Sequence, residues 1–377
     1  MTSSHHHKIS ALLNRKFYYL RYKALPVLVG LLLLYGSGTS TFAQENIPAD
    51  DDYGVTIEEQ VTSQKINKPE KKDYLSISIE NDVLGGGTDQ FYTSGVRLTY
   101  FNSGFDVPDA MEELDDFIPT FDVNTTTSTF YTIGQNIYTP QDISISANQD
   151  SDRPWAGFLY GSIGLLTVDD NHLDELELTL GVVGSPAFGE QTQKFVHSHV
   201  TSSPTPKGWS NQLDFEPGLI LSWQRRWPRA LSADLGEFRF RTEPSIGVSL
   251  GNIYTYAETG LMFSFSPDRD IIQDTPPRVR PSMPGSGYFD TPDDGWSWQL
   301  FAGATGRAVG RNIFLDGNTF KDSHSVDKNY FVGDVTGGLA FTLGDYRLAY
   351  SINYRSDEFK NQNDDSVFGS LTLSTRF

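Results

Sequence analysis

The chain has 377 residues, a formal net charge of −19 and no cysteine, and the missing cysteine excludes a small secreted domain held together by disulfides. A negative field of this kind disfavours nucleic acid as a partner and favours cations, including divalent metal ions. The sequence also contains 34 glycines and is 13% aromatic.

Residues 1–43 have the features of a secretory signal peptide. A basic region between Arg15 and Lys23 precedes the apolar run ALPVLVGLLLLYG, and small residues then lead to Ala43. The apolar run is shorter than the roughly 20 residues that a membrane-spanning helix needs. We expect cleavage after Ala43, which removes five basic residues and no acids and changes the formal charge from −19 to −24. An exported, acidic, cysteine-free and aromatic-rich chain is typical of the bacterial outer membrane.

Alternation of apolar and polar residues dominates the sequence after a polar segment at 44–72, which we predict to be a disordered periplasmic lead-in. In YLSISIE, for example, Leu75, Ile77 and Ile79 share one face of a strand. Similar runs predict twelve strands at 74–80, 93–101, 129–138, 157–168, 175–184, 217–226, 237–250, 252–265, 296–309, 328–343, 345–356 and 366–377. An even number of such strands predicts an all-β fold, a transmembrane antiparallel β-barrel over residues 73–377.

The last strand, SLTLSTRF, ends in Phe377 and resembles the sorting signal of outer-membrane barrels. The mean hydropathy of −0.37 agrees with a barrel, because only every second residue of a strand faces lipid. With both termini in the periplasm, the connections after odd-numbered strands face outward, at 81–92, 139–156, 185–216, 251, 310–327 and 357–365. The inward connections 102–128 and 266–295 are longer than the usual periplasmic turns.

Most residues suited to chemistry fall on the outward connections, so we expect a site at the extracellular rim. An acidic, oxygen-rich rim without cysteine suits calcium better than zinc. Another motif, G-x-S-x-G at Gly247 to Gly251, lies within a predicted strand and not on a strand-to-helix turn, so we interpret it as a coincidence.

Five segments carry a resemblance to a known family: ENDVLGGGTDQFYTSGVRLTY, GQNIYTP, SDRPWAGFLYGS, LGVVGSPAFGEQTQKFVH and PKGWSNQLDFEPGLIL. Together they resemble the LpxR family of outer-membrane lipid A 3'-O-deacylases, over about residues 73–377 and in the family's order. The resemblance implies a twelve-stranded barrel, in agreement with the strand count. It also implies an enzyme that uses calcium to remove the 3'-linked acyloxyacyl group of lipid A in the outer leaflet.

The resemblance also implies roles for individual residues. His197 would be the general base that activates water, and Asp82 would be a calcium ligand. Asn81 and Thr93 would complete the polar cluster around metal and water, and Asn81 is a candidate for fixing the imidazole tautomer. Histidine suits ester hydrolysis because its pKa lies near the working pH. A bound cation can stabilise the oxyanion without transferring a proton.

The sequence departs from the resemblance at one position. We would expect a basic residue shortly after the YTP motif, but none occurs between Pro140 and Asp152. Arg153 and Lys207 are candidate substitutes for binding the charged substrate. The partners expected from these features are lipid A or lipopolysaccharide and outer-membrane lipid, with no nucleic acid, and the protein is expected to be a monomer.

Two other functions remain open from the sequence. An outer-membrane phospholipase would share barrel, calcium and histidine but would use a serine nucleophile. Ser198 adjoins His197, yet neighbours in an extended segment point to opposite faces, whereas His199 would share the face of His197. A passive porin or structural barrel is the third possibility, although an aqueous channel needs about sixteen strands.

Overall fold

The computed structural model describes residues 56–67, 73–85, 91–104, 107, 121–201, 204–267, 273–276, 278–279, 287–290, 295–362 and 366–377. The predicted signal peptide lies outside the described residues, as do 44–55 and 68–72 of the predicted lead-in. No helix in the described ranges has the length and apolar character needed to cross a membrane.

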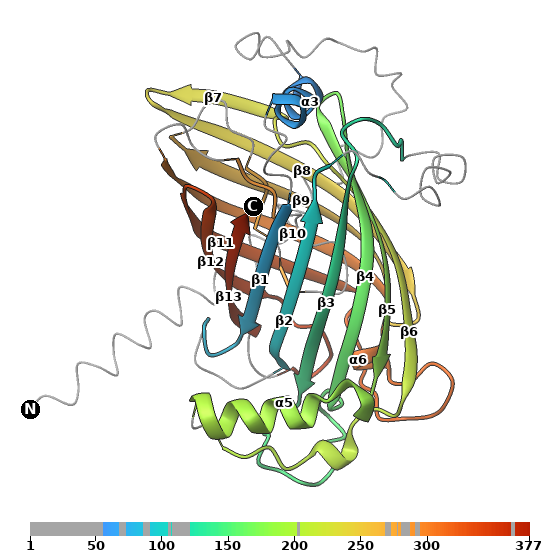
Figure 1. The fold of residues 1–377 in the computed structure, drawn as a ribbon. Helices are drawn as coiled ribbons and strands as arrows, with labels where there is room; N and C mark the ends of the chain where they lie inside the picture. Colours follow the sequence, from blue (N-terminus) through green and yellow to red (C-terminus); the bar gives the residue numbers. More distant parts are fainter. Residues whose placement is uncertain are drawn as a thin grey trace, which may run out of the picture. The chain divides into compact units, whose positions relative to one another are not determined.

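Thirteen strands of the described part of the chain form one antiparallel sheet, and twelve of them close into a barrel (Figure 1). The twelve are β1 (Asp73–Asn81), β2 (Phe91–Asn102), β3 (Ser128–Thr139), β4 (Ala156–Asp169), β5 (His172–Val183), β6 (Glu216–Arg226), β8 (Phe238–Gly251), β9 (Tyr254–Ser266), β10 (Trp296–Asn312), β11 (Phe331–Leu343), β12 (Tyr346–Arg355) and β13 (Ser366–Arg376). Barrel strands that follow one another in the chain pair with one another, and the β1–β13 pairing completes the ring. The predicted twelve-stranded barrel is confirmed, and each predicted strand overlaps an observed one.

The strands alternate between an apolar outer face and a polar inner face. On β1 the outward Ile77 and Ile79 are 41% and 40% exposed, whereas the inward Ser76 and Ser78 are buried. The same outward pattern recurs around the ring at Val96, Leu98, Ile133, Leu178, Leu180, Leu219, Leu221, Leu261, Leu300, Leu339, Leu348, Leu371 and Leu373. A continuous apolar outer band on a closed barrel is the surface that contacts lipid in a membrane-spanning protein.

Strand β7 (Leu231–Leu235) was not predicted from the sequence. It pairs only with the beginning of β8, and Leu235 lies opposite Phe238 across a two-residue turn. Gly236 begins this turn with a φ of 72°, a conformation that favours glycine. The strand has no buried face, so it lacks the alternation by which the barrel strands were recognised.

Helix α3 (Ile57–Asn67) corrects the prediction that 44–72 lacks regular structure. A capping box begins the helix, because Thr56 Oγ1 accepts from the Glu59 N–H at 3.1 Å. Glu59 Oε2 in turn accepts from the Thr56 N–H at 2.9 Å. The Thr56-x-x-Glu59 pattern was therefore present in the sequence, but high polarity concealed it.

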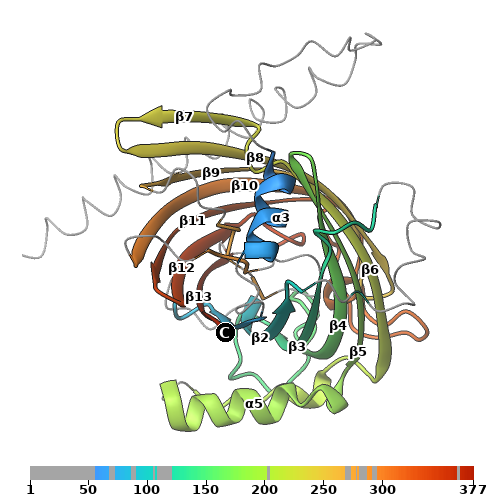
Figure 2. The ribbon, with the colours of Figure 1, turned by 45° about the horizontal axis from the view of Figure 1, so that its top comes forward.

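Helix α3 is held at the end of the barrel where β1 begins and β13 ends, which we call the terminal end (Figure 2). Ile57 and Val61 are buried in one cluster with Tyr74 and other apolar residues of the wall. One further turn along, Lys65 Nζ donates to the carbonyl oxygens of Thr126 and Thr127 at 2.7 and 3.0 Å. Tertiary contacts of this kind stabilise a short helix that would be marginal alone.

Described residues of the long connection predicted at 266–295 lie in the barrel interior. Asp274 is buried and pairs with Arg226 of β6, and its carbonyl accepts from Arg347 of β12 at 2.9 Å. Asp290 pairs with Arg376 of β13 at 3.0 Å. Because Arg226, Arg347 and Arg376 are themselves buried, they stabilise these acids inside the barrel, and the length of this connection has a structural explanation.

At the opposite end, which we call the loop rim, lie the connections that follow β1, β3, β5, β8, β10 and β12 (Figure 1). A buried apolar cluster lies inside the barrel here, and within it the rings of Tyr138 and Phe314 stack with centroids 4.0 Å apart. Phe314 belongs to the short helix α6 (Ile313–Asp316). The predicted grouping of the six outward connections at one end is confirmed, whereas their extracellular location stays a prediction.

Candidate active site

The connection after β5 is helical where the sequence predicted an extended segment. It contains a 3₁₀ turn at Ser185–Ala187, helix α5 (Gly189–Val196) and a π-helical turn at His197–Thr201. The His197 N–H donates to the carbonyls of Gln193 and Lys194, and its φ and ψ are −63° and −35°. Successive side chains therefore turn by about 100° about the helix axis instead of alternating, and the expectation that His197 and His199 share a face is wrong.

Helix α5 is attached to the outside of the barrel wall at the loop rim (Figures 1 and 2). Gln135, which lies on the outward face of β3, donates through Nε2 to the Ala187 carbonyl at 2.5 Å. A Cβ at Gly157 of β4 would lie 3.2 Å from Ala187 Cβ and from Gly189. Glycine at 157 thus permits a close approach between helix and wall.

A buried apolar cluster under the neighbouring loops fixes this arrangement. Ile137, on the same outward face of β3, packs with Ile143, Trp155 and Trp209. A Cβ at Gly189 would lie 2.6 Å from the Trp209 ring, so the first residue of α5 sits directly on that ring. The site is therefore built on the lipid-facing side of the wall and not in the lumen.

The His197 side chain is 5% exposed, and its Nδ1 lies 2.7 Å from the Pro204 carbonyl oxygen. A carbonyl can only accept a hydrogen bond, so Nδ1 carries the proton in the neutral ring and Nε2 carries the lone pair. This tautomer is the one required of a base that acts through Nε2. At Nδ1 this contact is to Pro204, and the orienting role that the sequence suggested for Asn81 stays a prediction.

Gln193 lies one helical turn before His197 and was missed as a site residue. It is 2% exposed, and its Oε1 accepts from Trp209 Nε1 at 2.8 Å. Among the described residues no hydrogen-bond partner is present for Gln193 Nε2. The spacing of four between Gln193 and His197 places both on one helical face, a signal that becomes readable once the segment is known to be helical.

Asp82 and Asn81 lie at the loop rim where β1 ends. Asn81 pairs across the sheet with Ser94 of β2 and Gly369 of β13. Asp82 is 1% exposed, and its Oδ1 accepts from the Val83 N–H at 2.8 Å. The chain then turns back, because the Gly85 N–H donates to the Asp82 carbonyl at 3.0 Å.

Thr93 occupies a β-bulge. The pairing of β2 with β3 shifts register between Tyr92 and Ser94, which leaves Thr93 as the extra residue. Because Asn81 lies opposite Ser94, the antiparallel register brings the backbone of Asp82 beside that of Thr93. Bulges re-aim side chains and are common next to active sites, but the Thr93 side chain lies outside the described part of the structure. Asn81, Asp82, Thr93 and His197 thus share the loop rim.

Asp82 and Asn81 offer carboxylate and amide oxygens, which are the donors that calcium prefers. Among the described residues, the acidic group whose oxygens converge as at a metal site is instead Glu58, Asp169 and Asp170 at the terminal end. Asp89, the other acid of the β1–β2 connection, lies outside the described residues. The donor chemistry at Asp82 therefore fits calcium, and the metal itself stays a prediction.

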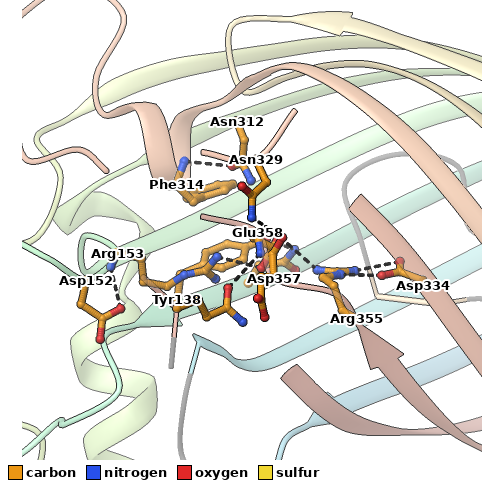
Figure 3. Close-up of polar contacts among 12 residues, drawn as sticks. Tyr138, Asp152, Arg153, Asn312, Phe314, Asn329, Asp334, Arg355, Asp357 and Glu358 are labelled. Atoms are coloured by element: carbon orange, nitrogen blue, oxygen red, sulfur yellow. Dashed lines mark hydrogen bonds and ion pairs between the residues drawn. The ribbon is translucent and has the colours of Figure 1, made fainter. Parts of the chain in front are cut away.

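Arg153 is fully buried and belongs to a chain of ion pairs inside the loop rim (Figure 3). Its Nη2 donates to Glu358 Oε2 at 2.8 Å, and its guanidinium lies over the Tyr138 ring at 5.6 Å. Burial alone would raise the pKa of Glu358, but Arg153 and Arg355 outweigh burial and hold that pKa below its ordinary value. These contacts favour a structural role for Arg153 over the predicted substrate binding.

Lys207 presents a different environment. Its side chain is exposed on the connection that carries His197, and its backbone N–H donates to the Ile143 carbonyl at 2.9 Å. Hydrogen bonds from Ser144 lower the pKa of Asp142, and the Lys207 charge adds a smaller effect of the same sign. Of the two predicted substrate-binding cations, Lys207 is the one that is open to a ligand.

Neither Ser198 nor Ser249 is positioned as a nucleophile that His197 could activate. Ser198 is exposed, and its hydroxyl donates to the Lys194 carbonyl at 2.8 Å and lies 2.7 Å from Nδ1 of His199. Ser249 of the G-x-S-x-G sequence lies within β8, where its hydroxyl meets that of Ser222 at 2.8 Å. That motif therefore belongs to the barrel wall, as the sequence predicted.

Comparison with known sequences and structures identifies proteins that are similar to this chain. The sequence pattern of the family described as "Outer membrane protein LpxR" matches residues 29–377. The structure of LpxR from Salmonella typhimurium superposes with a TM-score of 0.64 at 20% identity, covering 81% of this chain and 100% of that chain. The β domain of the Bordetella autotransporter BrkA gives 0.39 at 11% identity, covering 81% and 98%. No curated protein sequence matches. Because the family pattern extends over most of the sequence, the chain belongs to the LpxR family of outer-membrane proteins.

Proposed function

We propose that this protein is a calcium-dependent esterase that removes the 3'-linked acyloxyacyl group from lipid A in the outer leaflet. Family membership supports the coarser statement, an outer-membrane lipid A deacylase. The observation that carries the proposal is His197, whose Nδ1 is held by the Pro204 carbonyl at 2.7 Å on a helix attached to the lipid-facing wall. A base outside the barrel can meet a lipid that never leaves the membrane.

The reaction is a hydrolysis of an ester by water. His197 Nε2 takes a proton from water as the water oxygen attacks the ester carbonyl. The bond between the acyl carbon and the sugar oxygen then breaks, and the proton returns to the sugar oxygen to give a hydroxyl. The Pro204 carbonyl keeps accepting from Nδ1 throughout, so it also stabilises the transient imidazolium.

The negative charge on the ester oxygen needs partners during the attack. Calcium, held by Asp82 and Asn81, would supply positive charge at this oxygen. Gln193 Nε2, which has no hydrogen-bond partner among the described residues, is a suitable additional donor because it lies on the same helical face as His197. The exposed Lys207 is suited to a phosphate group of the substrate.

A phospholipase with Ser198 as nucleophile is the second candidate, and the 2.7 Å contact between Ser198 and His199 favours it. The same hydroxyl, however, donates to the Lys194 carbonyl within the helix, and both side chains are exposed. An exposed serine held by its own helix lacks the oriented base that a nucleophile requires. Direct attack by water at His197 is the better supported reaction.

The test is the mass of the product after purified protein is incubated with lipid A. With calcium present, we expect loss of the 3'-acyloxyacyl group, and with excess chelator we expect no product until calcium is restored. Phospholipid in the same vesicles should stay intact. Cleaved phospholipid with intact lipid A would favour the phospholipase, and full activity in excess chelator would rule out the metal.

A further inference from the structure

Helix α5 carries aromatic side chains on the face that points away from the barrel. Phe195 of α5 and Phe188, the residue directly before the helix, are 61% and 55% exposed. His199 extends this face by stacking on Phe195 with ring centroids 4.7 Å apart. The opposite face, with Gly189, Gln193 and His197, is buried against the protein.

The conformation of Phe188 makes its exposed ring harder to attribute to packing. Phe188 joins the 3₁₀ turn to α5 with a φ of 57°, in the left-handed region. Glycine or asparagine adopts this conformation at lower cost than a bulky residue. The exposed Phe188 ring therefore stands at a position where a smaller residue would meet less backbone strain, and a contact with the surroundings of the protein is one use for it.

The aromatic face continues the lipid-facing band of the barrel. Between α5 and the terminal end, the outward Ile133 of β3 is 57% exposed, and Leu180 of β5, two strands away, is 58% exposed. Phe215, also 58% exposed, adjoins the start of the connection, because a Cβ at Gly184 would lie 2.8 Å from the Phe215 nitrogen. The exposed rings thus lie at the edge of a surface that contacts acyl chains, and not on an isolated patch.

We propose that the aromatic face of α5, formed by Phe188, Phe195 and His199, is immersed in the membrane at the boundary between acyl chains and head groups. An aromatic face beside cations is typical of helices that lie in this boundary, and Lys194 is 47% exposed on the same helix. The immersion itself is independent of the proposed esterase activity. Its consequence, that α5 holds His197 at the depth of the ester groups, rests on that proposed function.

Spin labelling can test the depth of this face, because the chain has no native cysteine. Phe195→Cys and Phe188→Cys each receive a nitroxide in bilayers that contain lipopolysaccharide. Collision with oxygen, which concentrates in the acyl region, is compared with collision with a water-soluble nickel chelate. Ile133→Cys in the lipid-facing band and Ala147→Cys on an exposed rim loop provide the membrane and water references.

Labels at 195 and 188 should shift toward oxygen, as at 133, whereas a label at Lys194→Cys should stay accessible to nickel, as at 147. Nickel accessibility at 195 equal to that at 147 would overturn the proposal. Equal oxygen accessibility at 194 and 195 would overturn the assignment of one immersed face. Heat-dependent gel mobility confirms that each labelled barrel is folded. Because no activity is measured, a failed esterase assay and a failed labelling result remain distinguishable.

Discussion

At the residue scale, the fitness of His197 as a base depends on the Pro204 carbonyl, which accepts from Nδ1. Replacing this histidine with glutamine removes the proton acceptor and should lower the deacylation rate by about 10²–10⁴-fold. His199→Gln should have a small effect, because His199 lies on the exposed side of the helix. The deacylation rate of each variant is measured from the mass of the product. Heat-dependent gel mobility is the control that shows the barrel is folded. If the His197→Gln variant kept the wild-type turnover rate, His197 would be excluded as the base.

Trp209 gives a second prediction, because it orients Gln193 without belonging to the reacting groups. Trp209→Phe keeps an aromatic ring in the cluster with Ile137 and Trp155 but removes the donor to Gln193 Oε1. A lost hydrogen bond of this kind is worth about 1 kcal/mol, so kcat should fall several-fold while KM stays constant. An increase in KM at unchanged kcat would assign Trp209 to substrate binding instead. Trp209→Leu, which also loses the ring, should additionally lower the stability.

The sequence was informative about site residues only where a strand positions them. Asn81 and Asp82 end a strand of regular alternation, so their place at the rim followed from counting strands. Thr93 could be placed at the rim but not on a bulge, because a bulge shifts pairing without changing composition. Pro204 and Gln193 were out of reach, since their roles depend on the path of a connection that alternation does not describe.

At the scale of elements, the same division separates strands from helices. Each barrel strand has one face in lipid and one in the interior, and this produces the period of two that the sequence shows. Helices α3 and α5 rest on the barrel by one side only, so few apolar residues mark them. The capping box of α3 and the Gln193–His197 spacing of α5 are weak local signals. They can be interpreted as helical only when the contact of each helix with the barrel is known.

The ion pair between Arg153 and Glu358 joins two rim connections and predicts a measurable loss of stability. Glu358→Ala leaves the Arg153 guanidinium buried with one fewer partner, which typically costs about 3–5 kcal/mol. We expect a lower midpoint for the heat-dependent mobility shift. The double variant Arg153→Met/Glu358→Leu should recover much of the loss, because it leaves no unpaired buried charge. Failure of the double variant to recover would show that these groups act separately.

The pH dependence of this pair has a defined sign. The folded-state pKa of Glu358 lies below its ordinary value, so the ionised carboxylate contributes to stability at neutral pH. That contribution is complete above the unfolded pKa of glutamate and is lost as the pH falls through the folded value. The Glu358→Gln variant should therefore differ most from wild type at neutral pH and converge with it in acid. A difference that grows in acid would contradict the assignment.

At the scale of the whole molecule, side chains of the described residues occupy the interior toward both ends, while the proposed chemistry lies outside. Asp274 and Asp290 pair with buried arginines toward the terminal end, and the Tyr138–Phe314 stack lies inside the loop rim, so we expect the lumen to be blocked at both ends. If the lumen is blocked at both ends, weakening the contacts at one end leaves the block at the other end in place. The reconstituted wild-type protein should therefore show no ion conductance in planar bilayers.

The variants that separate these two barriers complete the prediction. The double variant Asp274→Ala/Asp290→Ala removes two buried ion pairs at the terminal end. Its lumen should stay closed, because the stack that contains Phe314 remains at the loop rim. Phe314→Ala alone should also stay closed, since the two ion pairs remain. We expect conduction only from the combination, because only then are the contacts at both ends weakened. Open-channel steps in the wild type would contradict a filled lumen and revive the porin alternative. Conduction by the combined variant, with deacylation retained, would show that the barrel serves as a scaffold for a reaction on its outer surface.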